Sequence, residues 1–155
     1  MLLVIFFKKN IDFICVIKKL FLPLYSQNNN SMATNSYIGK QLSNGSIKSV
    51  YCHWDGKPSH NGKILKEHYT DESKIDTLLD MGSMEVLDKE IGVKLTKHQA
   101  RDGQCIFYGR DHDKDNKGPV VYENLESWLN KRPGIEWYYL WDGNEWKTYK
   151  SEYQY

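Results

Sequence analysis

The chain has 155 residues, of which 40% are apolar and 26% are charged, which suits one soluble globular domain and is too little for two. The net charge is +1, but residues 32–155 contain 17 basic and 19 acidic side chains. General nucleic-acid binding needs a basic excess, so the charge excludes that class of protein. Cys15, Cys52 and Cys105 form no Cys-x-x-Cys pair, which favours reduced thiols in a cytoplasm over disulfides or a zinc site.

Residues 1–31 differ from the rest of the chain. Two lysine pairs interrupt their apolar runs, which therefore fall short of the roughly 20 apolar residues of a membrane-spanning helix. We predict a leader that lies outside the folded unit, either disordered or upstream of the true start, followed by a single domain at 32–155. An interfacial membrane anchor is the alternative for the leader. We expect no membrane contact for residues 32–155.

The predicted domain begins with two strands and two helices. Strands at 36–42 and 46–54 flank Asn44-Gly45, the strongest short signal for a β-hairpin. Helices follow at 61–69 and from the N-cap Thr70 to the C-cap Gly82. Residues 83–98 show a mixed pattern, and we predict a turn followed by an extended or irregular link there.

Further elements are predicted in the second half of the domain. We expect a strand at 104–110, a short helix at 124–130 and a hairpin of 135–141 with 145–149. Hairpins at both ends favour neighbouring strands that run in opposite directions. The predicted fold class is therefore α+β, with an antiparallel sheet of about five strands and two to three helices packed on one face.

The first group of candidate ligand-binding residues begins at the end of the second predicted strand and continues into the turn and the helix start that follow it. Imidazole and carboxylate groups in one strand–turn segment can bind a metal, although a structural tie between the strand and the turn is the simpler interpretation. A helix start that contains Gly62 and a lysine attracts phosphate. The group comprises Tyr51, His53, Trp54, Asp55, His60, Asn61 and Lys63.

The second group is Tyr108 with Arg110, on one face of the predicted strand at 104–110. An aromatic ring beside a guanidinium can stack on a nucleotide and clamp it. A cross-strand surface pair is the alternative. No catalytic residue, metal ligand or cofactor is assigned, because the sequence contains no Gly-x-Ser-x-Gly motif and no histidine with a recognisable nucleophile.

The run from Tyr51 to Pro58 carries a family resemblance. It reads Tyr-Cys-His-Trp-Asp-Gly-Lys-Pro, and a helix ending in His68-Tyr69 follows. This pattern resembles a family of small bacteriophage proteins whose core reads Tyr-Cys-His-Trp-Asp-Gly-Tyr-Pro; Lys57 stands in place of its second tyrosine. The likeness covers most of residues 33–149. It implies a phage or viral origin and an accessory role in the host cytoplasm, such as counter-defence.

These observations leave three functions open, in a definite order. The first is a non-enzymatic accessory protein that sequesters a small anionic nucleotide signal. The second is a protein-interaction inhibitor of a host enzyme, acting through exposed aromatic residues of the tail at 137–149. The third is a metal-dependent hydrolase or nuclease that uses His53 and Asp55. Binding is thus favoured over catalysis, the partner is a nucleotide or a host protein, and a homo-oligomer stays open.

Overall fold

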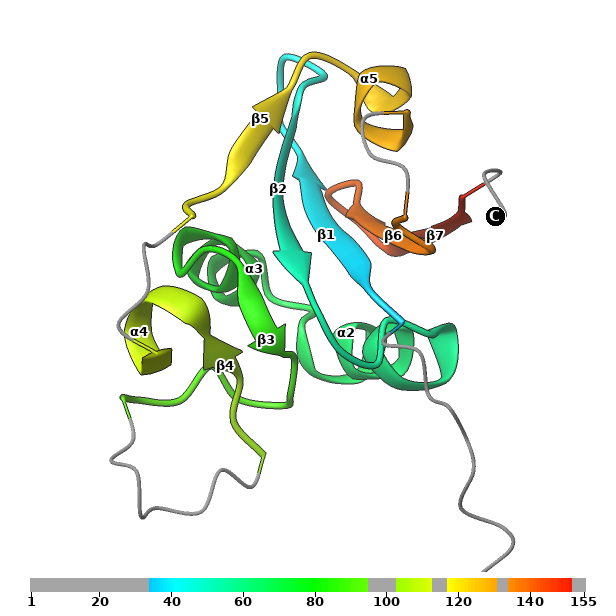
Figure 1. The fold of residues 1–155 in the computed structure, drawn as a ribbon. Coiled ribbons are helices and arrows are strands. Elements are labelled where there is room, and N and C mark those ends of the chain that lie inside the picture. The colour runs from blue at the N-terminus through cyan, green and yellow to red at the C-terminus, as the bar shows by residue number, and fades with distance from the viewer. Residues whose placement is uncertain (1–33, 95–102, 113–116, 131–133, 152–155) are drawn as a thin grey trace, which may run out of the picture. The chain divides into compact units, whose positions relative to one another are not determined.

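The computed structural model describes residues 34–94, 103–112, 117–130 and 134–151. The predicted leader at 1–31 lies outside these segments. No helix within them is long and apolar enough to cross a membrane. In chain order the elements are β1 Ser36–Gln41, β2 Ile47–Cys52, the π-helical turn η1 Pro58–Gly62, α2 Lys63–His68, α3 Glu72–Asp80, β3 Met84–Val86, β4 Ile106–Phe107, α4 Tyr108–His112, β5 Val120–Tyr122, α5 Leu125–Leu129, β6 Trp137–Trp141 and β7 Trp146–Lys150 (Figure 1).

The described strands form one mixed sheet of seven strands. Its order is β4-β3-β2-β1-β6-β7, and β5 also pairs with β2. The pairs β1–β6 and β2–β3 are parallel, whereas the other pairs are antiparallel. The predicted antiparallel sheet of about five strands is therefore wrong. A hairpin signal specifies only how the two strands of that hairpin pair, so it does not specify how the two hairpins pair with each other. In the structure β6 of the last hairpin runs beside β1 in the same direction (Figure 1).

Helices pack against both faces of this sheet, so the prediction that they lie on one face is also wrong. Successive residues of a strand point to opposite faces, and two separate cores result. On one face Ile38 and Val50 pack with Leu65 of α2 and Ile75 of α3. On the other face Trp128 of α5 packs in a second cluster that contains residues of β1, β2, β5 and β6.

Trp128 holds α5 against the second face. Its Nε1 donates a hydrogen bond of 2.9 Å to Ser49 Oγ. A Cβ atom at Gly39 would lie 3.0 Å from the indole carbon Cζ2, so glycine at this position lets the ring approach β1 closely. A capping box between Asn124 and Ser127 starts the helix. These contacts account for the stability of a helix of five residues, which would not persist in isolation.

The two helices predicted after β2 are present with shorter bounds. The turn η1 occupies Pro58–Gly62, and α3 follows Asp71 rather than Thr70. The Asp71 carboxylate accepts a hydrogen bond of 3.0 Å from Lys74 N, which is the N-cap role predicted for Thr70. Gly82 follows α3 with φ at 84°, a conformation that favours glycine after a helix.

The strand predicted at 104–110 is only partly present. It ends at Phe107, and α4 begins with the next residue. The Asp111 carboxylate accepts a hydrogen bond of 2.8 Å from Phe107 N, which satisfies a backbone donor next to the first turn of α4. Tyr108 and Arg110 are therefore helical, and the prediction that they share a strand face is wrong. The link predicted at 83–98 as extended or irregular contains the short strand β3, which lies between β2 and β4.

Candidate functional site

The carboxyl end of β2 places Tyr51 and His53 on the face of the sheet opposite the α2–α3 core. Cys52 lies between them in sequence, is buried in that core and stands beside Met84 of β3. The pairing continues beyond the strand, since His53 N donates to Met84 O at 3.1 Å and Trp54 N donates to Glu85 O at 3.0 Å. Because side chains alternate along a strand, Glu85 points to the same face as Tyr51 and His53.

Tyr51 orients the imidazole of His53. The tyrosine hydroxyl and His53 Nδ1 lie 2.8 Å apart, within hydrogen-bond distance. The ring of Trp54 meets the imidazole edge-on, with centroids 4.6 Å apart, and its side chain is 37% exposed. An indole that is this exposed and supported by a second ring offers a surface on which a planar ligand can stack.

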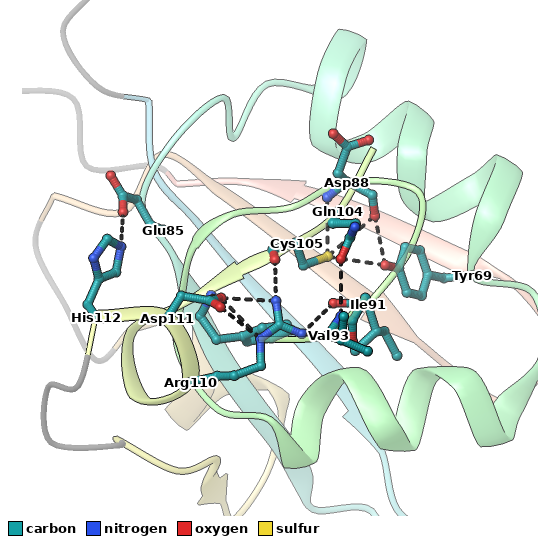
Figure 2. Close-up of polar contacts among 12 residues, drawn as sticks. Tyr69, Glu85, Asp88, Ile91, Val93, Gln104, Cys105, Arg110, Asp111 and His112 are labelled. Carbon is teal, nitrogen blue, oxygen red and sulfur yellow. Dashed lines mark hydrogen bonds and ion pairs between the residues drawn. The ribbon is translucent and has the colours of Figure 1, made fainter. Parts of the chain in front are cut away.

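Helix α4 brings Tyr108 and His112 to the same face. Their ring centroids lie 6.0 Å apart. His112 Nε2 and Glu85 Oε2 lie 2.5 Å apart, so this contact fastens α4 to β3 (Figure 2). The pKa of Tyr108 is raised, first by burial and then by the nearby Tyr51 and Glu85. We call Tyr51, His53, Glu85, Tyr108 and His112 the aromatic–imidazole face.

A row of tyrosines supports this face from within the sheet. Tyr37 of β1 stands in register with Tyr51 on one side and with Tyr138 of β6 on the other, and Tyr138 stands in register with Tyr149 of β7. The ring of Tyr37 meets that of Tyr51 edge-on at 6.0 Å and stacks on that of Tyr138 at 5.9 Å. Such cross-strand aromatic pairs stabilise a sheet, so they help to hold the ring of Tyr51 in position.

Arg110 lies within α4, and its guanidinium bonds to other parts of the protein. Nη1 donates to the carbonyl oxygens of Ile91 and Gly92 at 2.7 and 2.9 Å, and Nη2 donates to that of Cys105 at 2.6 Å. The guanidinium also pairs with the Asp111 carboxylate at 2.9 Å (Figure 2). These contacts tie the segment after β3 to β4. They give Arg110 a structural role, and a ligand contact of this residue stays a prediction.

The remaining predicted residues do not converge with the face. Asn61 is fully buried, and its amide donates to Ser36 Oγ and to the carbonyl oxygen of Trp54 at 3.2 and 3.1 Å. This amide ties η1 to β1 and to the segment after β2, a structural role. His60 is exposed, and Asp55 is an exposed turn residue with φ at 56°.

Lys63 is exposed on α2 and lies 3.9 Å from Glu67, one helical turn later. The helix start therefore does not combine with the aromatic–imidazole face. Of the nine predicted ligand-binding residues, the structure brings together Tyr51, His53 and Tyr108, with Trp54 at the edge of the group.

Metal and thiol chemistry find little support in the described segments. Within them, no group of three histidine, cysteine, aspartate or glutamate side chains is placed to hold a metal ion. Burial raises the pKa of Cys52 to about 12 and also raises that of Cys105. Both groups therefore remain thiols at neutral pH, which is unfavourable for a nucleophile.

The aromatic tail contributes to the cores more than to the surface. Tyr138, Tyr139, Trp141 and Trp146 are buried, whereas Trp137 is half-buried. Both Trp146 and Tyr139 use their polar atoms internally, to bond the carbonyl oxygens of Tyr69 and Gly56 at 2.7 and 2.6 Å. The exposed aromatic surface that the second function requires is therefore small on β6 and β7.

Glu85 and His112 were not predicted as site residues. Glu85 lies on a strand of three residues inside a stretch without period, and His112 stands in a polar run that resembles a loop. The alternation around Met84 is the one local signal for Glu85, and it is too short to be distinguished from chance.

Comparison with known proteins adds no further assignment: no protein-family model, no curated protein and no solved structure matches the chain.

Proposed function

We propose that the chain is a non-enzymatic binding protein that holds a small nucleotide on the aromatic–imidazole face. The observation that supports this proposal is the convergence of Tyr51 and His53, from the end of β2, with Tyr108 of α4, which is more than fifty residues away in sequence. Each ring is fixed by a neighbour and remains partly exposed, so the face is ordered in advance of binding.

The chemistry of the face suits a nucleobase and a phosphate together. Tyrosine and tryptophan rings stack on a planar base, and tyrosine hydroxyls and imidazole N–H groups donate hydrogen bonds to phosphate oxygens. The carboxylate of Glu85 can accept a hydrogen bond from an exocyclic amino group. Anion recognition here depends on His53, because His112 is bound to the Glu85 carboxylate and the guanidinium of Arg110 is occupied by backbone carbonyls and Asp111.

The proposed biological role is sequestration of a host nucleotide signal in the host cytoplasm. It rests on the Tyr-Cys-His-Trp-Asp-Gly motif, which resembles that of the bacteriophage family, and on the binding chemistry of the face. Counter-defence is the role that this combination implies, since removal of a signal requires only tight binding. Sequestration predicts that the ligand leaves the protein chemically unchanged.

Isothermal titration calorimetry with a panel of mononucleotides and cyclic dinucleotides tests the proposal. We expect one ligand class to bind and to be recovered intact by mass spectrometry. Truncation of His53 to alanine should weaken binding by at least tenfold, since it removes the imidazole and the partner of Tyr51. His60→Ala is the matched control, because His60 is exposed nearby but lies outside the face.

Two results would contradict the proposal. One is that no nucleotide of the panel binds the folded protein. The other is that His53→Ala and His60→Ala weaken binding equally. Recovery of a cleaved ligand would instead favour the hydrolase, and a metal analysis of the same preparation would identify the cation that such an activity uses.

A further inference from the structure

Strand β5 forms an open edge of the sheet. Among the described strands it pairs with β2 alone, and Figure 1 shows it at the outer side of the domain. Val120 and Val121 are 48% and 58% exposed, and they are two of the four large apolar side chains that are exposed in the described segments. An apolar edge strand with unpaired backbone groups is a template on which another strand can pair.

Alternation along β2 shows which residue of β5 faces the open edge. Leu42 N bonds to Ser46 O across the hairpin, so the even-numbered residues of β2 direct their backbone groups towards β1 and the odd-numbered residues direct theirs away from it. Ser49 belongs to this set and stands opposite Val120. Val120 therefore bonds towards β2, and the backbone N–H and C=O of Val121 point to the open edge.

The two ends of this edge carry opposite charges. Exposed Lys117 precedes β5, and exposed Glu123 follows it. The carbonyl oxygen of Lys117 accepts a hydrogen bond of 3.0 Å from Ser83 N, which fixes the start of the segment against the strand next to it. Antiparallel pairing of two copies would bring the basic end of each edge to the acidic end of the other. Parallel pairing would instead bring like charges together, which is unfavourable.

We propose that the chain forms a two-fold symmetric homodimer in which the β5 strands of two copies pair antiparallel. The contact is isologous, so Val120 and Val121 of each copy cover the same residues of the other, and two copies complete it. The sheet then continues from one protomer into its partner. Pro119 is compatible with this arrangement, because proline is tolerated on edge strands and its carbonyl oxygen still accepts a hydrogen bond.

Sedimentation velocity of the full chain over a wide concentration range tests the dimer. We expect a monomer–dimer equilibrium that Lys117→Glu or Glu123→Lys weakens on the order of tenfold, because like charges then face each other twice. The double variant exchanges both charges and should restore the dimer. Val121→Glu should abolish the dimer, whereas Val93→Glu should leave it intact, since Val93 is 67% exposed but lies outside β5.

Several outcomes would overturn the proposal. A chain that stays monomeric at every concentration excludes the dimer. A dimer that Val93→Glu and Val121→Glu weaken equally does not use β5. A double charge exchange that fails to restore the dimer excludes antiparallel pairing. Amide hydrogen exchange needs no substitution: protection of the Val121 amide should rise with protein concentration, and constant protection would contradict pairing at this edge.

Discussion

Replacement of Arg110 by methionine would separate a structural role from a ligand-binding one. The guanidinium donates to the carbonyl oxygens of Ile91, Gly92 and Cys105 and to the Asp111 carboxylate, at distances of 2.6 to 3.1 Å. The side chains of Arg110 and Asp111 are only 11% and 5% exposed. Methionine fills a similar volume but makes none of these bonds, and it deprives a buried carboxylate of its cationic partner.

The expected loss follows from this burial. Removal of one partner from a buried ion pair costs about 3–5 kcal/mol, and the residual exposure of Arg110 favours the lower end, about 3 kcal/mol. Urea unfolding followed by tryptophan fluorescence measures the loss. Arg110→Met/Asp111→Asn should recover part of it, because the second substitution removes the buried negative charge that the guanidinium had offset. Lys63→Met is the control and should cost less than about 0.5 kcal/mol, since Lys63 is 65% exposed.

A specific pair of results would refute the structural role of Arg110. Arg110→Met would have to unfold at the same urea concentration as the unmodified chain, and it would have to lose nucleotide binding. Those results together would place the guanidinium in contact with the ligand. Reduced stability with nucleotide affinity retained at low temperature is the outcome that the contacts of Arg110 lead us to expect.

Two further predictions concern titratable groups in the core. Lys40 has a raised pKa: burial alone would lower it, but hydrogen bonds to two carboxylates of α3 outweigh that effect. The charged Lys40 should therefore contribute about 1 kcal/mol to the free energy of unfolding. This contribution should be complete below pH about 10.4, and it should disappear as the pH rises through the pKa of Lys40 in the folded protein. The difference in unfolding free energy between the unmodified chain and Lys40→Met measures this contribution. A difference that stays constant up to pH 12 would contradict the prediction. In a Cys15→Ser background, Cys52 and Cys105 should react with a thiol reagent at pH 8 only after urea is added, and rapid labelling of the native protein would show that their thiols are accessible.

Local signals in the sequence predicted the elements better than their arrangement. Asn44-Gly45 indicated the first hairpin, and its two strands pair as expected, because a turn and an alternating pattern act over a few residues. The parallel pairing of β1 with β6 joins segments from the two ends of the domain, and no local pattern specifies it. The same limit explains why α5 was not predicted on the opposite face from α2 and α3.

The candidate site was predicted where alternation was clear. Tyr51 and His53 follow the period of a strand, and the structure places both on one face. Tyr108 reaches the face through a helix rather than the predicted strand. Arg110 was assigned to a ligand because it stands near an aromatic residue, but the carbonyl groups that bind it come from a distant loop. The sequence shows that Arg110 is a hydrogen-bond donor, but it does not show which acceptor groups contact the guanidinium in the folded protein.

The parallel contact between β1 and β6 has a consequence for the order of folding. β1 lies between β2 and β6, so the first strand of the domain completes its hydrogen bonds only when residues 137–141 arrive. Until then the nascent chain carries Ile38 and its neighbours with one side of the strand uncovered. Contacts between segments so distant in sequence slow the search for the native state. Assembly of the central sheet is therefore a late event, completed after most of the domain has left the ribosome.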